Sequence, residues 1–401
     1  MHNSASRLCC LKLIVGLVPM KILHVAQSLK GGPASYFDEI IPHQIQRYGA
    51  ENVVLLIPAD DLQYLSTATL AATIRTFPTR NRSAIALWQF AAAFVRSQRQ
   101  AQPNIVHLHS TYAGAIGRLA NVFRRRRPLI VYCAHGWAFE RNDGKKGLGQ
   151  ALVVTIERTL AAITDRVINL SESDQLKTDQ LGIARGRSLV IKNAIAARDL
   201  PTQVKPERRE AMGLRPEVTN LLFVGRLDKQ KGVDILIELM NSLEGMPFHL
   251  SMIGQRVTDG DHPDIPFPDN VTHLGWIHRQ DVLGYYDACD VLIMPSRWEG
   301  MPITLLEAMR SGLPAVTSNR SALPYVVLDR ISGRVSPELT AAAFKEILLT
   351  TTGTEWAEYG IAARMEFEAN YNADKLCSAL DEMYENLLLE NLKHPYQVVT
   401  E

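Results

Sequence analysis

Short apolar segments alternate with amphipathic segments along almost the whole chain, and this alternation is what most constrains the fold. Strands separated by helices of about 10–15 residues form βαβ units, in which the strands are parallel. Right-handed crossovers between such strands produce a doubly wound α/β sheet. In the first half the expected strands are 22–26, 53–57, 105–109, 129–134, 166–170 and 188–191. The expected helices there are 33–47, 84–99, 113–124, 148–162 and 173–182.

A second series of the same kind fills the rest of the chain. Its expected strands are 221–224, 249–253, 271–274, 291–294, 315–317 and 333–335, and its expected helices are 233–242, 280–288, 303–311 and 339–350. Between the two series, segment 194–216 is polar and contains three prolines, which predicts a linker. A chain of 401 residues also exceeds what one core usually supports, so we expect two domains, at 20–195 and 196–372. An amphipathic helix at 373–392 follows the last strand and could pack across their junction.

The first 19 residues are expected to lie outside the fold. Their apolar part, 8–19, is shorter than the roughly 20 residues a membrane span needs, and Lys12 interrupts it. A signal peptide stays open as an alternative, although no clear small-residue cleavage site precedes the first strand. Because the strand segment KILHVAQS follows Met20 at once, Met20 is the candidate start. The five cysteines are an odd number without a CxxC motif, which favours a reducing, cytoplasmic compartment.

Charge is divided unevenly between the two halves. Residues 1–200 contain 25 Lys and Arg but 13 Asp and Glu, whereas the remainder contains 18 and 29. The basic half would be attracted to anionic partners such as phospholipids, lipid pyrophosphates or nucleic acid. Its densest part is Arg124, Arg125, Arg126 and Arg127, which could equally be the solvated end of a helix.

The strongest local signal is segment 297–310, RWEGMPITLLEAMR. Glu299 follows a strand, so it lies at the edge where open α/β sheets bind ligands. Pro302 stands where a helix can start, and Glu307 lies about one turn into that helix. The free amides of the first turn can hold a diphosphate, and a carboxylate can bind vicinal hydroxyls of a ribose or hexose. Two carboxylates at this spacing are a weak signal by themselves, because Glu307 could equally face solvent.

The second signal is segment 223–234, FVGRLDKQKGVD. Gly225 closes a strand, and Arg226 and Lys231 project from the loop that follows. Two cations at the carboxyl end of a strand can neutralise a diphosphate and stabilise it as a leaving group. A solvated charged loop is the alternative.

A third signal is the Gly31-Gly32 pair after the first strand. Glycines at a βα turn let the backbone approach a phosphate or a sugar closely. The turn lacks the GxGxxG pattern, so it gives no support for a dinucleotide site. A purely structural turn is the alternative.

Three further groups of polar residues follow expected strands or loops. His135 follows a strand, where a side chain enters the interdomain cleft, although a lone histidine there is often structural. His107 and His109 alternate along one strand and point to one face, but no cysteine or carboxylate accompanies them locally, so we expect no metal. The Asp259-Gly-Asp261 triplet could chelate a metal, but its Pro- and Asp-rich surroundings favour a plain polar loop.

Taken in order, these segments resemble the retaining glycosyltransferases of family 4. The likeness extends from residue 20 to about 390, and its most specific parts are PSRWEGMPITLLEAMRSGLPAV and VGRLDKQKGVDIL. It implies the GT-B fold, in which two Rossmann-like domains face a central cleft and the segment 373–401 crosses back to the first domain. The chain has Asn193-Ala194-Ile195 where the family often has Asn-Gly-Val, and Trp298 and Thr304 are individual choices in the main motif.

The resemblance also implies a role for each motif residue. Arg226 and Lys231 would bind the donor diphosphate and serve in catalysis. Glu299 would be catalytic and would contact hydroxyls of the donor sugar, and Glu307 would contact the ribose. His135 would be catalytic and lie beside the transferred sugar. His109 and His135 would both lie on the acceptor side. The other donor-site residues it implies are Gly31, Gly32, Gly225, Gly254, Trp276, Gly300, Met301, Ile303 and Thr304.

The function implied is transfer of a hexose-type sugar from a nucleotide-diphosphate sugar to a glycan or lipid-linked acceptor, with retention and without metal or cofactor. The strings AHGWAF and LSESD are similar to members that build surface polysaccharides. We expect a cytoplasmic enzyme whose basic domain can lie on the inner face of the plasma membrane. No nucleic-acid partner is expected, because aromatic residues do not interleave with basic ones. Two alternatives stay open: a nucleotide-sugar epimerase, and a non-enzymatic module that binds a membrane surface or nucleic acid.

Overall fold

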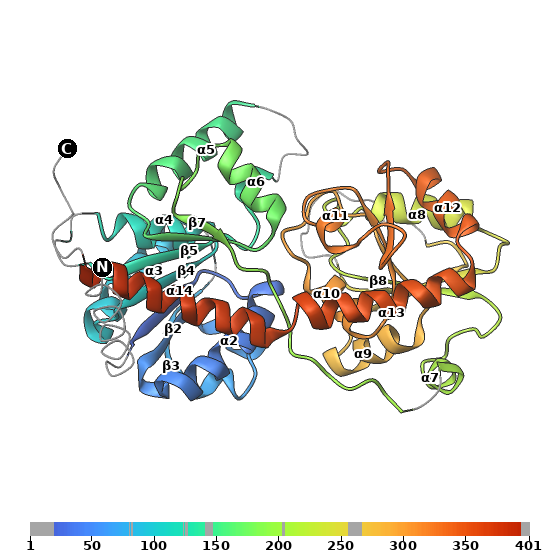
Figure 1. The fold of residues 1–401 in the computed structure, drawn as a ribbon, viewed down its shortest axis with the longest axis horizontal. Coiled ribbons are helices and arrows are strands. Elements are labelled where there is room, and N and C mark those ends of the chain that lie inside the picture. The colour runs from blue at the N-terminus through green and yellow to red at the C-terminus, as the bar shows by residue number, and fades with distance from the viewer. Residues whose placement is uncertain are drawn as a thin grey trace, which may run out of the picture. The chain divides into compact units, whose positions relative to one another are not determined.

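The computed structural model describes residues 20–79, 81, 83–122, 124, 127–140, 147–202, 205–255 and 267–393. Their contacts divide the chain into two compact units (Figure 1). The first ends at Asn193 and resumes at Ala373, and the second spans Ala194–Asn372. Each contains a parallel sheet with helices between its strands, so the predicted pair of doubly wound α/β domains is confirmed. The expectations for residues 1–19, for Arg125 and Arg126, and for Asp259 and Asp261 lie outside the described residues.

The first unit is built on a seven-stranded sheet in the order β3-β2-β1-β4-β5-β6-β7. Its strands are β1 (Ile22–Ala26), β2 (Val53–Pro58), β3 (Thr73–Phe77), β4 (Ile105–His109), β5 (Leu129–Cys133), β6 (Arg166–Asn169) and β7 (Ser188–Val190). The strand order reverses between β1 and β4, which makes the carboxyl ends of these two strands the switch point of the sheet. The sequence analysis missed β3, an edge strand that reads TIRTF and is mostly half-buried, because it contains no apolar run.

Helices cover both faces of this sheet. They are α2 (Gly32–Tyr48), α3 (Ala84–Ala101), α4 (Thr111–Leu119), α5 (Leu148–Ala161), α6 (Glu172–Gln180) and α14 (Ala373–Lys393). The expected helix 113–124 is wrong at both ends, since α4 starts two residues earlier and ends at Leu119. Ser171 caps α6 by accepting a hydrogen bond from the amide of Asp174.

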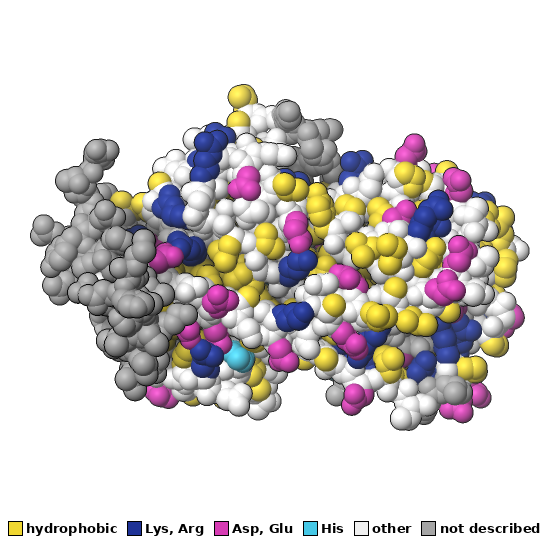
Figure 2. Space-filling view, viewed as in Figure 1, with side chains coloured by type: hydrophobic (Ala, Val, Ile, Leu, Met, Phe, Trp, Pro, Cys, Tyr) yellow, Lys and Arg dark blue, Asp and Glu magenta, His cyan; other side chains and the backbone are white. Residues whose placement is uncertain are grey.

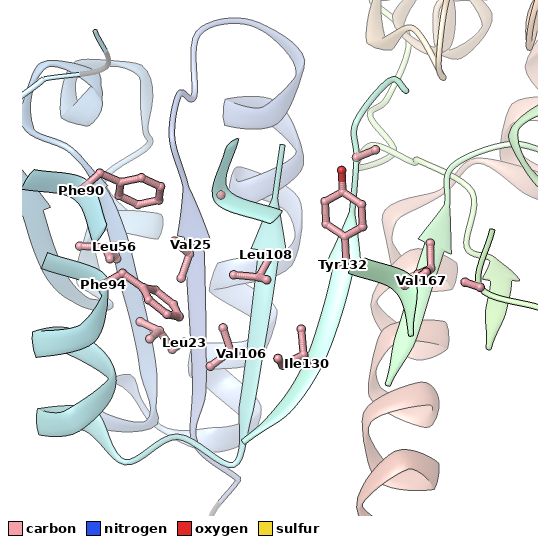
Figure 3. Close-up of a cluster of buried hydrophobic side chains, with 14 of the residues drawn as sticks. Leu23, Val25, Leu56, Phe90, Phe94, Val106, Leu108, Ile130, Tyr132 and Val167 are labelled. Atoms are coloured by element: carbon pink, nitrogen blue, oxygen red, sulfur yellow. The ribbon is translucent and has the colours of Figure 1, made fainter. Parts of the chain in front are cut away.

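The two faces of the first sheet differ in character. Leu23 and Val25 of β1 point to the face covered by α3, where Phe90 and Phe94 complete an apolar core (Figure 3). Because side chains alternate along a strand, His24 points to the opposite face. That second face carries buried polar side chains.

Helix α14 packs against α2 within the first unit (Figure 1). The Asp381 carboxylate on α14 pairs with His43 Nε2 at 2.7 Å and accepts a hydrogen bond from the Tyr48 hydroxyl at 2.7 Å. Arg47 forms an ion pair with the same carboxylate at 3.2 Å. The late helix is therefore joined by specific polar contacts to the unit that begins the chain.

The second unit is built on a six-stranded sheet in the order β10-β9-β8-β11-β12-β13. Its strands are β8 (Thr219–Val224), β9 (Phe248–Ile253), β10 (Val271–Gly275), β11 (Val291–Met294), β12 (Ala315–Ser318) and β13 (Gly333–Ser336). The helices are α7 (Lys205–Ala211), α8 (Val233–Ser242), α9 (Arg279–Ala288), α10 (Ile303–Arg310), α11 (Leu323–Val326), α12 (Ala341–Thr350) and α13 (Gly353–Asn370). Here the switch point lies between β8 and β11.

Segment 194–216, which was expected to be a linker, is grouped with the second unit and is partly helical. It contains α7, and Lys205 and Arg209 both pair with Asp290 of the second unit. Arg198 pairs in the same way with Asp287. These charged side chains attach the segment to the second unit.

The 18-residue helix α13 was also missed. Its buried stripe includes Trp356, Ala363 and Phe367, but Ile361 and Met365 on the other side are exposed. Apolar residues on both sides obscure the helical period in the sequence. None of the described helices is long and apolar enough to cross a bilayer.

Candidate functional site

Two loops meet at the switch point of the second sheet. Strands β8 and β11 pair directly, with Leu221 opposite Val291, so the loops that follow them are neighbours. The loops touch at Gly232, whose φ is +71°. An added Cβ there would lie 2.0 Å from the Pro295 carbonyl oxygen, so this position has no room for a side chain. This close contact holds together the segments that carry the sequence-predicted charged residues.

Lys231 and Glu299 form an ion pair across these loops. The Lys231 Nζ atom lies 2.7 Å from Glu299 Oε1, and the two side chains are only 14% and 7% exposed. The Lys231 amide donates to Asp228 Oδ1 at 3.0 Å, which fixes the loop around it. Arg226, the other predicted cation, is half-exposed and pairs with the same aspartate at 3.2 Å. Lys231 is thus almost buried in its ion pair with a carboxylate, whereas Arg226 extends toward solvent.

The amino terminus of α10 lies at the end of the loop that carries Glu299. Pro302 is its N-cap, and its carbonyl oxygen accepts from the amides of Leu305 and Leu306. Within the described residues, no backbone acceptor is found for the amides of Ile303 and Thr304. Such amides, together with the positive end of the helix dipole, favour an anion. Gly300 and Met301 complete the loop between Glu299 and this helix.

Glu307 lies inside the second unit, so the solvent-facing alternative for it is wrong. It is 9% exposed, and its Oε2 accepts a hydrogen bond from the Tyr286 hydroxyl of α9 at 3.1 Å. Burial, and then the negative charge of Glu307, raise the pKa of Tyr286 well above its ordinary value. The phenol therefore stays protonated and holds the carboxylate in one orientation.

Glycine-rich turns lie beside these loops. Gly254 follows β9 at φ +143°, and an added Cβ would lie 1.8 Å from the Gly225 carbonyl oxygen. The Gly254 amide donates to the carbonyl oxygen of Gly275 at 2.8 Å. The next residue, Trp276, is 64% exposed. The indole of Trp276 is thus exposed beside the closely packed turns at Gly225, Gly254 and Gly275. It offers a flat apolar surface to a planar ring.

The first unit places its predicted residues at the carboxyl ends of β1, β4 and β5. Gly31 and Gly32 form the exposed start of α2, where an added Cβ would meet nothing within 4 Å. His135 follows β5 in the left-handed region, at φ +51°. A non-glycine residue there is strained, which is more common at functional positions than elsewhere. His109 is fully buried, and its Nδ1 lies 2.9 Å from His135 Nε2, so it lies behind His135 rather than at the surface.

The structure explains only part of the arginine run at 124–127 and of the basic excess in residues 1–200. Of the four arginines, Arg127 pairs with Asp165, its Nη2 lying 3.0 Å from Oδ1. On the face shown in Figure 2, basic and acidic side chains are interspersed rather than gathered by sign. The basic excess of residues 1–200 is therefore not collected into one patch on that face.

Two family models match the chain. Residues 204–351 match glycosyl transferases group 1, and residues 31–194 match the glycosyl transferase 4-like domain. The two matches cover most of both units and include the loops described above. The chain belongs to the GT-B glycosyltransferases.

Relatives of this glycosyltransferase are similar over most of its length. An uncharacterized 41.2 kDa protein in the cps region of Klebsiella pneumoniae is 28% identical over 358 residues, which cover 88% of this chain and 95% of that protein. The UDP-Gal:alpha-D-GlcNAc-diphosphoundecaprenol alpha-1,3-galactosyltransferase of Escherichia coli is 28% identical over 283 residues, which cover 67% of this chain and 72% of that protein.

Solved structures show the same fold. Anabaena Alr3699/HepE in complex with UDP-glucose is similar with a TM-score of 0.74 at 18% identity, covering 92% of this chain and 100% of that one. At this identity the likeness concerns the fold of the glycosyltransferase alone.

Several residues of the glycosyltransferase that support these loops were not predicted. Tyr286 holds Glu307, and Gln230 donates from its side chain to the Trp298 carbonyl oxygen at 3.1 Å. His24 of β1 joins His109 on the buried face of the first sheet. Of these residues, only His24 could have been found from the sequence, because it alternates with apolar neighbours in the same way as His107 and His109.

Proposed function

We propose that this glycosyltransferase transfers a hexose from a nucleoside diphosphate sugar to a lipid-linked or glycan acceptor in polysaccharide biosynthesis, with retention at the anomeric carbon. The observation that carries this proposal is the Lys231–Glu299 ion pair, which lies at the switch point of the second sheet beside the start of α10. The two loops together present a cation, a carboxylate and helix amides that have no backbone acceptor. The cation and the amides match the diphosphate of a nucleoside diphosphate sugar, and the carboxylate matches its hydroxyls.

Departure of the diphosphate is the step that these groups would assist. Lys231, Arg226 and the amides of Ile303 and Thr304 would face the two phosphoryl groups. Lys231 and the two amides are held in place before the reaction, so they stabilise the charge that grows on the leaving oxygen without reorganising. The exposed end of Arg226 can move onto the ligand, whereas Lys231 is fixed by its partner.

The sugar and the ribose would be held by the two glutamates. Glu299 would accept hydrogen bonds from hydroxyls of the hexose, and Glu307 from the ribose. Hydrogen bonds from hydroxyls to a carboxylate are charge-assisted and stronger than neutral ones. Trp276 would pack on the nucleobase, and Gly225 and Gly254 would let the backbone approach it.

Retention requires attack from the face that the diphosphate leaves. The acceptor hydroxyl would lose its proton to an oxygen of the departing phosphate, so no protein carboxylate need flank the bond on the opposite face. We propose that this chemistry uses no metal ion, and that Gly31, Gly32 and His135 of the first unit serve the transferred sugar and the acceptor.

A lipid-linked acceptor is supported by the name of the Escherichia coli relative, which acts on a diphosphoundecaprenol-linked sugar. Such an acceptor is presented at a membrane surface. We propose that the glycosyltransferase works as a cytoplasmic enzyme at that surface, attracted by the basic excess of its first half. Binding to anionic vesicles in a flotation assay at low salt is the expected result, and absence of binding contradicts this part of the proposal.

The proposal is tested by supplying UDP-hexoses and other nucleoside diphosphate hexoses together with a polyprenyl diphosphate sugar. Transfer should occur in excess EDTA and give a product with the anomeric configuration of the donor, read from its NMR coupling. A product of inverted configuration contradicts the retaining mechanism. Activity lost in EDTA and restored by Mn²⁺ contradicts the metal-free chemistry and directs attention to Asp259 and Asp261. A parallel incubation without acceptor should leave the donor unchanged, whereas an isomerised donor would identify an epimerase.

A further inference from the structure

Three histidines gather on the buried face of the first sheet. His24 is on β1, and His107 and His109 are on the neighbouring strand β4, with His24 directly opposite His107. All three are 0% exposed. One ring nitrogen from each lies within 4.8 Å of the others.

The orientation of each ring is set from its outer side. His24 Nε2 donates to Gln44 Oε1 of α2 at 2.7 Å. His107 Nδ1 lies 2.6 Å from the Tyr384 hydroxyl of α14. His109 Nδ1 lies 2.9 Å from His135 Nε2. Metal-binding histidines have this arrangement, in which a second partner holds the nitrogen away from the ion.

The other nitrogen of each ring points inward. His24 Nδ1 lies 3.1 Å from His109 Nε2. His107 Nε2 is buried and has no hydrogen-bond partner among the described residues. A buried polar atom without a partner is unusual in a folded protein and calls for a ligand. The inward nitrogens thus form a converging set in which one member is unsatisfied.

We propose that His24, His107 and His109 bind one Zn²⁺ ion inside the first unit. Three imidazoles without a carboxylate suit zinc, whereas Mg²⁺, Ca²⁺ and Mn²⁺ prefer oxygen ligands. A tetrahedral ion with Zn–N bonds of about 2.0–2.1 Å separates its nitrogens by roughly 3.3 Å. The His24–His109 pair is already near that separation at 3.1 Å, and a ring nitrogen of His107 lies within 4.8 Å of both.

The ion would have a consequence beyond stability. With His109 Nε2 on the metal, its Nδ1 must carry the proton and donate to His135 Nε2. The proton of the neutral His135 ring then lies on Nδ1. Zinc binding would therefore fix both the place and the tautomer of the strained histidine after β5, although the ion itself takes no part in the transfer chemistry proposed above.

The test is metal binding by the full chain, purified without a polyhistidine tag and stripped of metal. Equilibrium dialysis against Zn²⁺ followed by elemental analysis should give one ion per chain, and Co²⁺ should give the visible absorption of a four-coordinate site. His107→Gln and His109→Gln should both lose the ion. Tyr384→Phe keeps the packing of α14 but removes the outer partner of His107, so zinc affinity should fall about 10-fold or more.

The matched control is His249→Gln. His249 is also a buried histidine, but it pairs with Thr272 in the second unit, so this variant should retain one ion. No stoichiometric zinc in the folded wild-type chain overturns the proposal, because the cluster is then a hydrogen-bonded histidine network. Zinc that survives both cluster variants also overturns it, since the ion would be bound elsewhere. If circular dichroism shows that either cluster variant is unfolded, Tyr384→Phe decides, and unchanged affinity in it contradicts the site.

Discussion

Lys231 Nζ and Glu299 Oε1 lie 2.7 Å apart in the loops that follow two adjacent parallel strands, and both side chains are almost out of contact with solvent. Burying two charges costs desolvation energy that their attraction repays only in part, so such a pair contributes little net stability. A pair of this kind at the switch point of a doubly wound sheet is better explained by a ligand than by folding.

Replacing both members of the pair separates folding from function. The double variant Lys231→Met with Glu299→Leu should keep the free energy of unfolding within about 1 kcal/mol of wild type, because apolar residues replace a buried ion pair at little cost. Sugar transfer should fall by roughly 100-fold or more, since the preorganised charges are gone. Urea denaturation and initial-rate assays measure the two effects.

The single variant Glu299→Gln should also lose about 100-fold in turnover while remaining folded. Glu238→Gln is its matched control, because Glu238 is exposed on α8 in the same unit. Near-normal turnover in Glu299→Gln would remove this carboxylate from the site.

The Tyr286→Phe variant tests whether the buried glutamate on α10 binds the donor. Removing the hydroxyl takes away one hydrogen bond that orients the Glu307 carboxylate, and a hydrogen bond to a charged group is worth about 1.5–3 kcal/mol. We expect the KM for the donor to rise about 10-fold with kcat little changed, because the ribose contact is the same in the ground and transition states. A fall in kcat with unchanged KM would place Glu307 at the reacting centre instead.

The glycine after β9 is required for the backbone contact beneath the proposed nucleotide site. Gly254→Ala should destabilise the second unit by about 3 kcal/mol or more, since its Cβ would overlap the Gly225 carbonyl oxygen. Gly245→Ala also replaces a glycine at positive φ, but nothing lies within 4 Å of the added Cβ, so it should cost about 1 kcal/mol. Equal losses in chemical denaturation would show that backbone strain, and not the close contact, sets the cost.

Asp174 on α6 gives the stability a specific dependence on pH. Burial, and then the negative charge of Glu140, raise the pKa of Asp174 from 3.8 to about 7 in the folded chain. Between these values the folded state binds more protons than the unfolded state, so the free energy of unfolding falls as pH rises from about 4 to about 7. Asp174→Asn removes this loss and should be more stable than wild type by about 2–4 kcal/mol above pH 7.

The measurement is the difference between variant and wild type in urea denaturation at pH 4, 5.5 and 7.5. That difference should grow with pH across the window. Asp179→Asn, on the exposed side of the same helix, separates the effect of burial from the loss of a charge. A difference that stays constant with pH would contradict an uncharged Asp174 in the folded state.

Much of the fold could be predicted because parallel strands buried on both faces read as apolar runs. Strands β1, β4 and β11 begin and end where the sequence placed them. Among the elements that were missed, β3 has too few apolar residues to show a period, and those of α13 are too widely distributed. In the site, the loops that carry Lys231 and Glu299 could be predicted because strand ends are visible in the sequence. The contacts of Tyr286 with Glu307, and of His24 with His109, could not, because they join residues brought together only by the packing of separate βαβ units.

The central claim is that the second unit binds a nucleoside diphosphate sugar through cationic side chains and the amino terminus of α10. Isothermal titration calorimetry of the full chain with a panel of such sugars, repeated with Arg226→Ala, tests it most directly. We predict heat of binding with at least one member of the panel and a loss of affinity of about 10-fold or more in the variant, since a charge-assisted contact to phosphate is removed. No heat with any member, or an affinity that Arg226→Ala leaves unchanged, would contradict the account.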